Sequence, residues 1–117
     1  MRLLAVVFSV LLTFWLAFPA MAGDFVPGTE DVPVMPGLTP VADSALVFDK
    51  PQGRIVEAQF QGRLKRAQIA AFYAETLPQL GWRQTGTDSW QRDDEILHLE
   101  FGETDGEVTV GFSLSPR

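Results

Sequence analysis

The sequence predicts a two-layer α+β domain, in which one helix packs on one face of an antiparallel sheet of five or six strands in the order ββαββββ. Residues 63–82 are the only segment after the N-terminus with strong helical periodicity. The last two predicted strands, residues 95–101 and 107–115, alternate apolar and polar residues. Such alternation is typical of an antiparallel sheet with one buried and one polar face.

The first 22 residues have the pattern of a secretory signal peptide. Arg2 precedes an apolar run over residues 3–18, and residues 20–22 read Ala-Met-Ala, the small-x-small pattern of a cleavage site. We therefore expect an exported, periplasmic protein that is cut after Ala22. If the leader stayed in place, residues 3–22 would anchor the chain in the inner membrane, and we expect membrane contact only in that case.

Residues 23–44 are predicted to be a proline-rich extended arm. Four prolines exclude a regular helix there and favour extended chain. The arm also carries more apolar residues than a free linker usually shows, so we expect either its own domain or a partner to cover them. These apolar residues are Val32, Val34, Met35, Leu38 and Val41.

Residues 45–117 are predicted to form the single α+β domain. The helical stripe consists of Ile69, Phe72, Thr76, Leu77 and Leu80. Pro78 and Gly81 mark the end of the helix, and Trp82 is expected to fold back on it or to begin the next strand. The predicted strands span residues 45–49, 54–61, 82–85, 89–92, 95–101 and 107–115.

Two apolar residues interrupt the predicted polar face of the sheet. Ile55 and Ile96 fall on that face by alternation, beside the small Gly111. We expect the proline-rich arm to lie over them, because this would cover both sets of apolar residues at once.

Three segments of the sequence resemble segments of a known group of proteins. Residues 31–38 read DVPVMPGL, residues 48–58 read FDKPQGRIVEA and residues 72–82 read FYAETLPQLGW, and an acidic hairpin with EILHLEF follows. This arrangement resembles a group of small exported proteins of alphaproteobacteria over most of the chain after residue 22. The resemblance implies export and one helix-on-sheet domain, and it implies no activity. The FYxxxLxxxGW helix is also similar to modules of envelope lipoproteins, whose anchoring Cys this chain lacks.

Composition argues against several classes of function. Of nine Lys and Arg residues only Arg2 precedes the cleavage site, and all 15 Asp and Glu residues follow it, so the cleaved chain would carry a net charge of −7. Such a surface repels phosphate backbones, and we expect no nucleic-acid partner. With one His and no Cys, and with acidic turns that do not match the calcium-binding loop, we expect no metal and no cofactor.

The leading hypothesis is a non-catalytic exported module that binds or stabilises another cell-envelope protein. Its motivation is the predicted export, the apolar residues on an arm that cannot form a core alone, and the lack of a recognisable catalytic cluster. The sequence does not predict an oligomeric state. The expected partner surface consists of Val34, Met35, Leu38, Ile55, Glu57, Ile96 and His98.

Two other hypotheses remain. The first is a binder of a small apolar ligand in a cavity between helix and sheet, and the second is an enzyme of unknown class that uses Glu57, His98 and Glu100. We expect no enzymatic activity, because a sheet of this size with one helix leaves little room for a dry cleft. The residues expected to line the ligand cavity are Phe60, Phe72, Tyr73, Trp82, Trp90 and Phe112.

Overall fold

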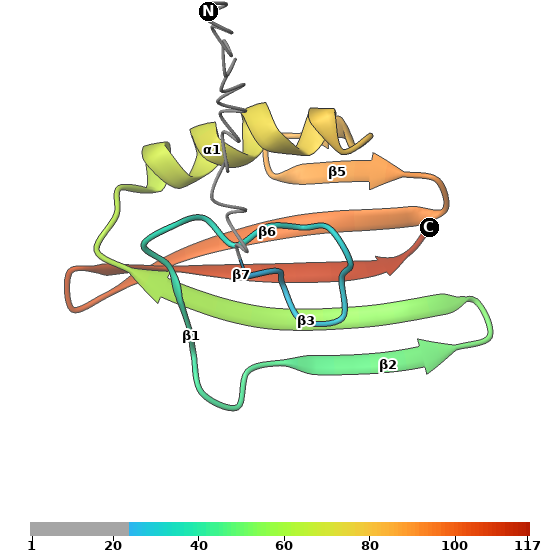
Figure 1. The fold of residues 1–117 in the computed structure, drawn as a ribbon, viewed down its shortest axis with the longest axis horizontal. Helices are drawn as coiled ribbons and strands as arrows, with labels where there is room; N and C mark the ends of the chain where they lie inside the picture. The colour runs from blue at the N-terminus through green and yellow to red at the C-terminus, as the bar shows by residue number, and fades with distance from the viewer. Residues whose placement is uncertain (1–23) are drawn as a thin grey trace, which may run out of the picture.

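The computed structural model describes residues 24–117, and the predicted signal peptide lies outside the described residues. The described part forms one antiparallel sheet of seven strands with one helix on it (Figure 1). The elements are β1 (Thr39–Pro40), β2 (Leu46–Lys50), β3 (Gly53–Gly62), α1 (Arg66–Gln79), β4 (Arg83–Gly86), β5 (Ser89–Arg92), β6 (Glu95–Thr104) and β7 (Glu107–Pro116).

The strand order is β1-β3-β7-β6-β5-β4, and β2 also pairs with β3. β1 and β2 share one side of β3: β1 pairs with Phe60 and Gln61, and β2 pairs with residues 53–57. The predicted α+β class and antiparallel pairing are thus confirmed, but the sheet is larger than predicted. The additional strand, β1, lies within residues 23–44, the segment predicted to be an extended arm.

The single helix follows its predicted boundaries closely but is rotated relative to the predicted stripe. Its buried residues are Ile69, Tyr73 and Leu77, while Phe72 is only partly buried. Gly81 takes a φ of +92°, and the N–H of Trp82 donates to the carbonyl of Leu77 over 3.1 Å, so the helix ends as predicted. Within residues 24–117, no helix has the length and apolar character needed to cross a membrane.

The arm lies beside α1, on the same face of the sheet (Figure 1). Val26, Val32 and Leu38 are buried in one cluster with the residues of the helix and the sheet. The arm passes so close to the sheet that a Cβ on Gly28 would overlap the side chains of Val47 and Val56. The predicted position of the arm is therefore wrong, because the arm covers the face opposite to Ile55 and Ile96.

The physical reason is that one helix is too narrow for this sheet. Tyr73 packs against Phe112 of β7, with ring centroids 5.3 Å apart, but the buried side chains of β3 also need a cover. The arm provides it. The prediction treated the helix as the whole second layer, whereas the second layer consists of the helix and the arm together.

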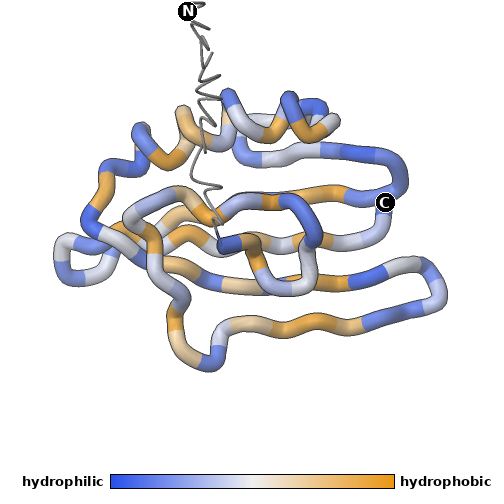
Figure 2. The backbone as a smooth tube through the Cα atoms, viewed as in Figure 1, coloured by the Kyte–Doolittle hydropathy of each residue, from blue (hydrophilic) through white to orange (hydrophobic). Residues whose placement is uncertain are grey.

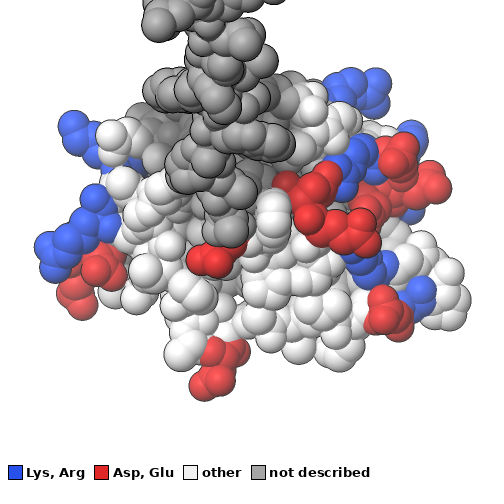
Figure 3. All heavy atoms as spheres, viewed as in Figure 1, with Lys and Arg blue, Asp and Glu red and all other residues white. Residues whose placement is uncertain are grey.

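Polar contacts hold the arm in place. Arg92 donates to both carboxylate oxygens of Asp31, over 2.6 and 3.2 Å. Arg54 donates to the carbonyl of Gly28 over 2.8 Å and pairs with Glu95 over 3.0 Å, and the hydrogen bond to Glu95 raises the pKa of Arg54. Figure 3 shows basic and acidic side chains gathered together at the right-hand end of this face.

Tyr73 connects the arm to the helix. Its hydroxyl donates to the carbonyl of Pro33 over 2.7 Å and accepts the N–H of Met35 over 3.1 Å. Burial raises the pKa of the Tyr73 phenol far above its ordinary value of about 10, and the Met35 N–H opposes this shift only in part.

We expect the free energy of unfolding to fall as pH rises above about 10, because only the unfolded chain then ionises its tyrosine. Below that pH the tyrosine is protonated in both the folded and the unfolded chain, and the free energy of unfolding does not change through its ionisation. Tyr73 is the only tyrosine, so the ultraviolet absorbance of tyrosinate reports it alone. Urea unfolding measured at a series of pH values should show this decrease in the free energy of unfolding in the natural chain. In Tyr73→Phe the part of the decrease that comes from tyrosine ionisation should be absent. A folded protein whose phenol ionised near pH 10 would contradict the expectation.

Candidate functional site

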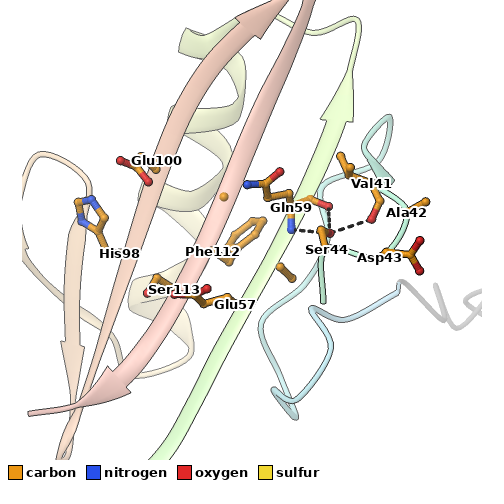
Figure 4. A pocket seen from close by; sticks show the side chains of 12 residues that line it. Val41, Ala42, Asp43, Ser44, Glu57, Gln59, His98, Glu100, Phe112 and Ser113 are labelled. Carbon is orange, nitrogen blue, oxygen red and sulfur yellow. Dashed lines mark hydrogen bonds between the residues drawn. The ribbon is translucent and has the colours of Figure 1, made fainter. Parts of the chain in front are cut away.

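The sheet face that points away from α1 and the arm is called the open face. It is formed by alternate side chains of β2, β3, β6 and β7. Strand register aligns Glu57, Ser113 and His98 in one row across the sheet. The next row contains Gln59, Gly111 and Glu100, and the two rows line a hollow of about 470 Å³ (Figure 4).

Gly111 gives this hollow its depth. It lies on β7 between Gln59 and Glu100, and a Cβ built on it would meet no atom closer than 3.8 Å. In Figure 4 the side chains of Glu100 and Gln59 stand on either side of the gap. An alanine at this position would therefore fit without a clash and would fill part of the hollow.

A turn between β1 and β2 forms one wall of the hollow. The hydroxyl of Ser44 donates to the carbonyl of Val41 over 2.8 Å and accepts the N–H of Gln59 over 3.1 Å. Val41 in turn donates its N–H to the carbonyl of Gln59 over 2.8 Å. These bonds tie the turn to β3, so Asp43 is held at the border of the hollow.

The hollow is acidic. Asp43, Glu57 and Glu100 line it, and its lining contains no Lys or Arg. His98 lies beside them, with Nδ1 3.0 Å from the hydroxyl of Ser89. Among residues 24–117 there is no group of three or more His, Cys, Asp or Glu residues close enough to hold a metal ion. The arrangement can therefore accept hydrogen bonds from a cationic group.

A second hollow adjoins the first along β3. Three apolar residues line it, Leu46, Phe48 and Ile55, together with the charged Asp49, Lys50 and Glu57. Glu57 borders both hollows, and the volume of the second is about 390 Å³. Phe48 is 50% exposed and Leu46 is 42% exposed. Acidic and apolar surface thus meet at Glu57 on the one sheet face that no other described element covers.

The predicted partner surface is divided between the two faces of the sheet. The structure places Ile55, Glu57, Ile96 and His98 on the open face, as their alternation predicts. The arm residues do not join them. Val34 and Met35 are partly buried in the layer beside α1 and Leu38 belongs to the core, so these three residues cannot share one surface with the other four.

Leu46 and Phe48 were missed by sequence reasoning. Residues 46–48 read Leu-Val-Phe, three consecutive apolar residues in a short predicted strand. When other elements cover only one face of a sheet, a strand at its border exposes such a run. The signal was therefore present, but it pointed to a surface only once β2 was known to be a border strand.

The aromatic residues predicted to line a ligand cavity mostly fill the core. Phe60 and Phe112 meet edge to face with centroids 5.6 Å apart, and Phe72 meets Tyr73 in the same way at 5.0 Å. A hollow of about 250 Å³ beside α1 is lined by Tyr73 and Trp90 of that set, with alanines of the helix.

Comparison with protein families, with curated proteins and with solved structures found no match to this chain.

Proposed function

We propose that this chain is a non-catalytic exported module that binds another cell-envelope protein through the open face. One observation carries the proposal: a sheet face that neither the helix nor the arm covers presents an apolar hollow directly beside an acidic one. Exposed apolar surface that adjoins a polar site is typical of a protein interaction surface.

The charges indicate the chemistry of the partner. Glu57 borders both hollows, and Glu100 and Asp43 line the acidic one. An extended segment with a Lys or Arg side chain next to an aliphatic or aromatic one would place each side chain in a hollow of matching character. Complementary charge contributes orientation and association rate, and the apolar contact contributes most of the affinity.

The enzyme hypothesis receives less support from the same geometry. Glu57, His98 and Glu100 do line one hollow, as that hypothesis requires. All three side chains are nevertheless exposed, and the hollow is open to solvent. General acid–base catalysis works best in a concave site that excludes water, which this face does not provide.

A small apolar ligand is the second candidate. It is favoured by the hollow beside α1, where Ala70, Ala71 and Ala74 leave space next to Trp90. This hollow is smaller than either hollow of the open face, and the lower limit for ligand pockets is about 300 Å³. Binding of a fluorescent apolar dye that Ala74→Leu abolishes would favour this candidate over the first.

The proposed function can be tested by crosslinking in a cell that exports the protein. A photoreactive side chain at Ile55 should crosslink to an envelope protein, whereas one at Gln84, exposed on β4 at the far border of the sheet, should not. Glu57→Lys with Glu100→Lys should lower the yield at position 55 by tenfold or more, because both carboxylates would become repulsive.

The matched control changes charge equally but elsewhere. Glu75 lies exposed on α1, and Glu103 lies exposed on β6 with its side chain on the opposite face from Glu100. Glu75→Lys with Glu103→Lys should leave the crosslinking yield unchanged. Equal losses in both charge variants, or equal crosslinking at positions 55 and 84, would show that the open face is not the binding surface.

A further inference from the structure

β2 forms a border of the sheet and carries unusually apolar side chains. Among residues 24–117 it pairs with β3 and with no other strand, so its second edge has no partner there. Leu46, Val47 and Phe48 are 42%, 48% and 50% exposed. Figure 2 shows this apolar run along β2, at the lower border of the sheet. Exposed apolar border strands are templates for pairing with another chain.

The direction of the backbone groups on this edge follows from the register. The carbonyl of Gln59 accepts a hydrogen bond from Val41, so odd-numbered residues of β3 turn their backbone groups toward β1 and β2. Their partners in β2 are the even-numbered residues, because Leu46 pairs with Glu57 and Phe48 with Ile55. The N–H and C=O groups of Val47 and Asp49 therefore point to the outer edge.

We propose that two copies of this chain pair through β2, antiparallel, about a two-fold axis at Val47. In this register Val47 faces Val47 of the second copy in a hydrogen-bonded pair. Leu46 of each copy faces Phe48 of the other, in the closer, non-hydrogen-bonded pairs where side chains touch best. All three exposed apolar residues of β2 then have apolar partners on the correct face of the sheet.

Neighbouring registers match less well. An axis at Phe48 would set Leu46 against Lys50 and Val47 against Asp49, which leaves the apolar side chains opposite charges. An axis at Asp49 would set two carboxylates directly opposite each other, which is destabilising. With the axis at Val47, Asp49 faces Ala45 and meets no like charge. Of these three registers, the one centred on Val47 alone gives each of the three apolar residues an apolar partner.

The pairing would extend the sheet without covering the open face. A two-fold axis perpendicular to the sheet keeps both open faces on the same side, so the two acidic hollows would lie on one continuous surface. Leu46 and Phe48, which line the apolar hollow, would then become its floor at the junction of the two copies. The inference does not depend on the proposed partner, because it rests on the backbone edge and register of β2, although Leu46 and Phe48 would take part in both contacts.

Single cysteines test the register, since the natural chain contains no Cys. The Cα atoms of a hydrogen-bonded antiparallel pair are about 5.5 Å apart, within the range that a disulfide spans. The full chain carrying Val47→Cys, produced in a cell that exports it and then oxidised, should become mostly disulfide-linked dimer. Gln84→Cys, on the exposed border strand β4, should stay at least tenfold less crosslinked.

A second pair of variants tests which residues of the two β2 strands face each other. Leu46→Cys and Phe48→Cys should each crosslink weakly alone, and should form a mixed dimer when both chains are produced together.

The oligomeric state can also be tested without cysteines. In sedimentation experiments the natural chain should be a dimer and Val47→Lys a monomer, and the control variant Gln84→Lys should stay dimeric. Equal crosslinking at positions 47 and 84 would overturn the proposal. So would a monomeric natural chain, which is the result expected if β2 instead accepts an extended segment of another protein.

Discussion

Removing residues 1–38 should abolish the cooperative unfolding transition of this protein, whereas removing residues 1–23 should preserve it. The longer deletion takes away Val26, Val32 and Leu38, which are 0%, 0% and 7% exposed. Full burial of an aliphatic side chain contributes roughly 1.5 to 3 kcal/mol, an upper estimate because the unfolded chain already hides some surface. Small domains are stable by only about 5 to 15 kcal/mol, so this loss is a large share of the total.

The deletion also removes polar partners from residues that stay behind. The Tyr73 hydroxyl loses Pro33 and Met35, and Arg92 loses the carboxylate of Asp31. A buried hydroxyl without a partner costs about 1 to 3 kcal/mol. Urea unfolding followed by tryptophan fluorescence measures the outcome, because Trp82 and Trp90 are both buried. A transition with unchanged midpoint and slope after the longer deletion would show that the arm is not part of the core.

Gly62→Ala should destabilise the protein by about 1 to 3 kcal/mol or more, the range found for overpacked cores. Gly62 ends β3 at the point where the arm crosses it, and a Cβ there would overlap the carbonyl oxygen of Gly37. That oxygen belongs to the backbone, which is held on both sides: Leu38 donates its N–H to Met35 over 3.1 Å, and Thr39 pairs with Gln61. Neither the backbone at Gly37 nor that of β3 at Gly62 can move aside without separating the arm from the sheet.

Gly111→Ala is the matched control. It is the same chemical change in a paired strand, but the added Cβ meets only ordinary contacts at 3.8 Å or more. We expect a change of less than about 0.5 kcal/mol, as for most surface substitutions. Hydrogen exchange of the arm should accelerate in Gly62→Ala alone. If both variants lost the same stability, the close approach of Gly37 to β3 would not be the cause.

Local patterns predicted most of the elements correctly. Alternation in residues 95–115 predicted the two long strands and the side chains that each face carries, because burial on one face imposes a period of two. The three- and four-residue spacing of apolar residues predicted α1, and Pro78 with Gly81 predicted its end. The predicted stripe was displaced from the buried face of the helix because it did not include Tyr73. In the fold it is 1% exposed, and its hydroxyl bonds to the arm.

The candidate site was predicted only in part. Glu57, His98 and Glu100 were correctly expected to share a face, since register and alternation place them there. Leu46, Phe48 and the turn at Ser44 were not expected to join them. Their inclusion depends on which strand lies next to β3 and on how the chain turns before β2, and neither follows from a local pattern.

The sequence by itself determined the class of the fold, the pairing direction of the sheet, the limits of the helix and the two faces of the long strands. These features depend on periodicity and turn residues, which act between near neighbours. Only the tertiary structure decided where the arm lies and which face stays open. A proline-rich segment has no period that points its apolar residues to one side, so its position is decided by the uncovered core beside α1. That same choice leaves the open face and the edge of β2 available for partners.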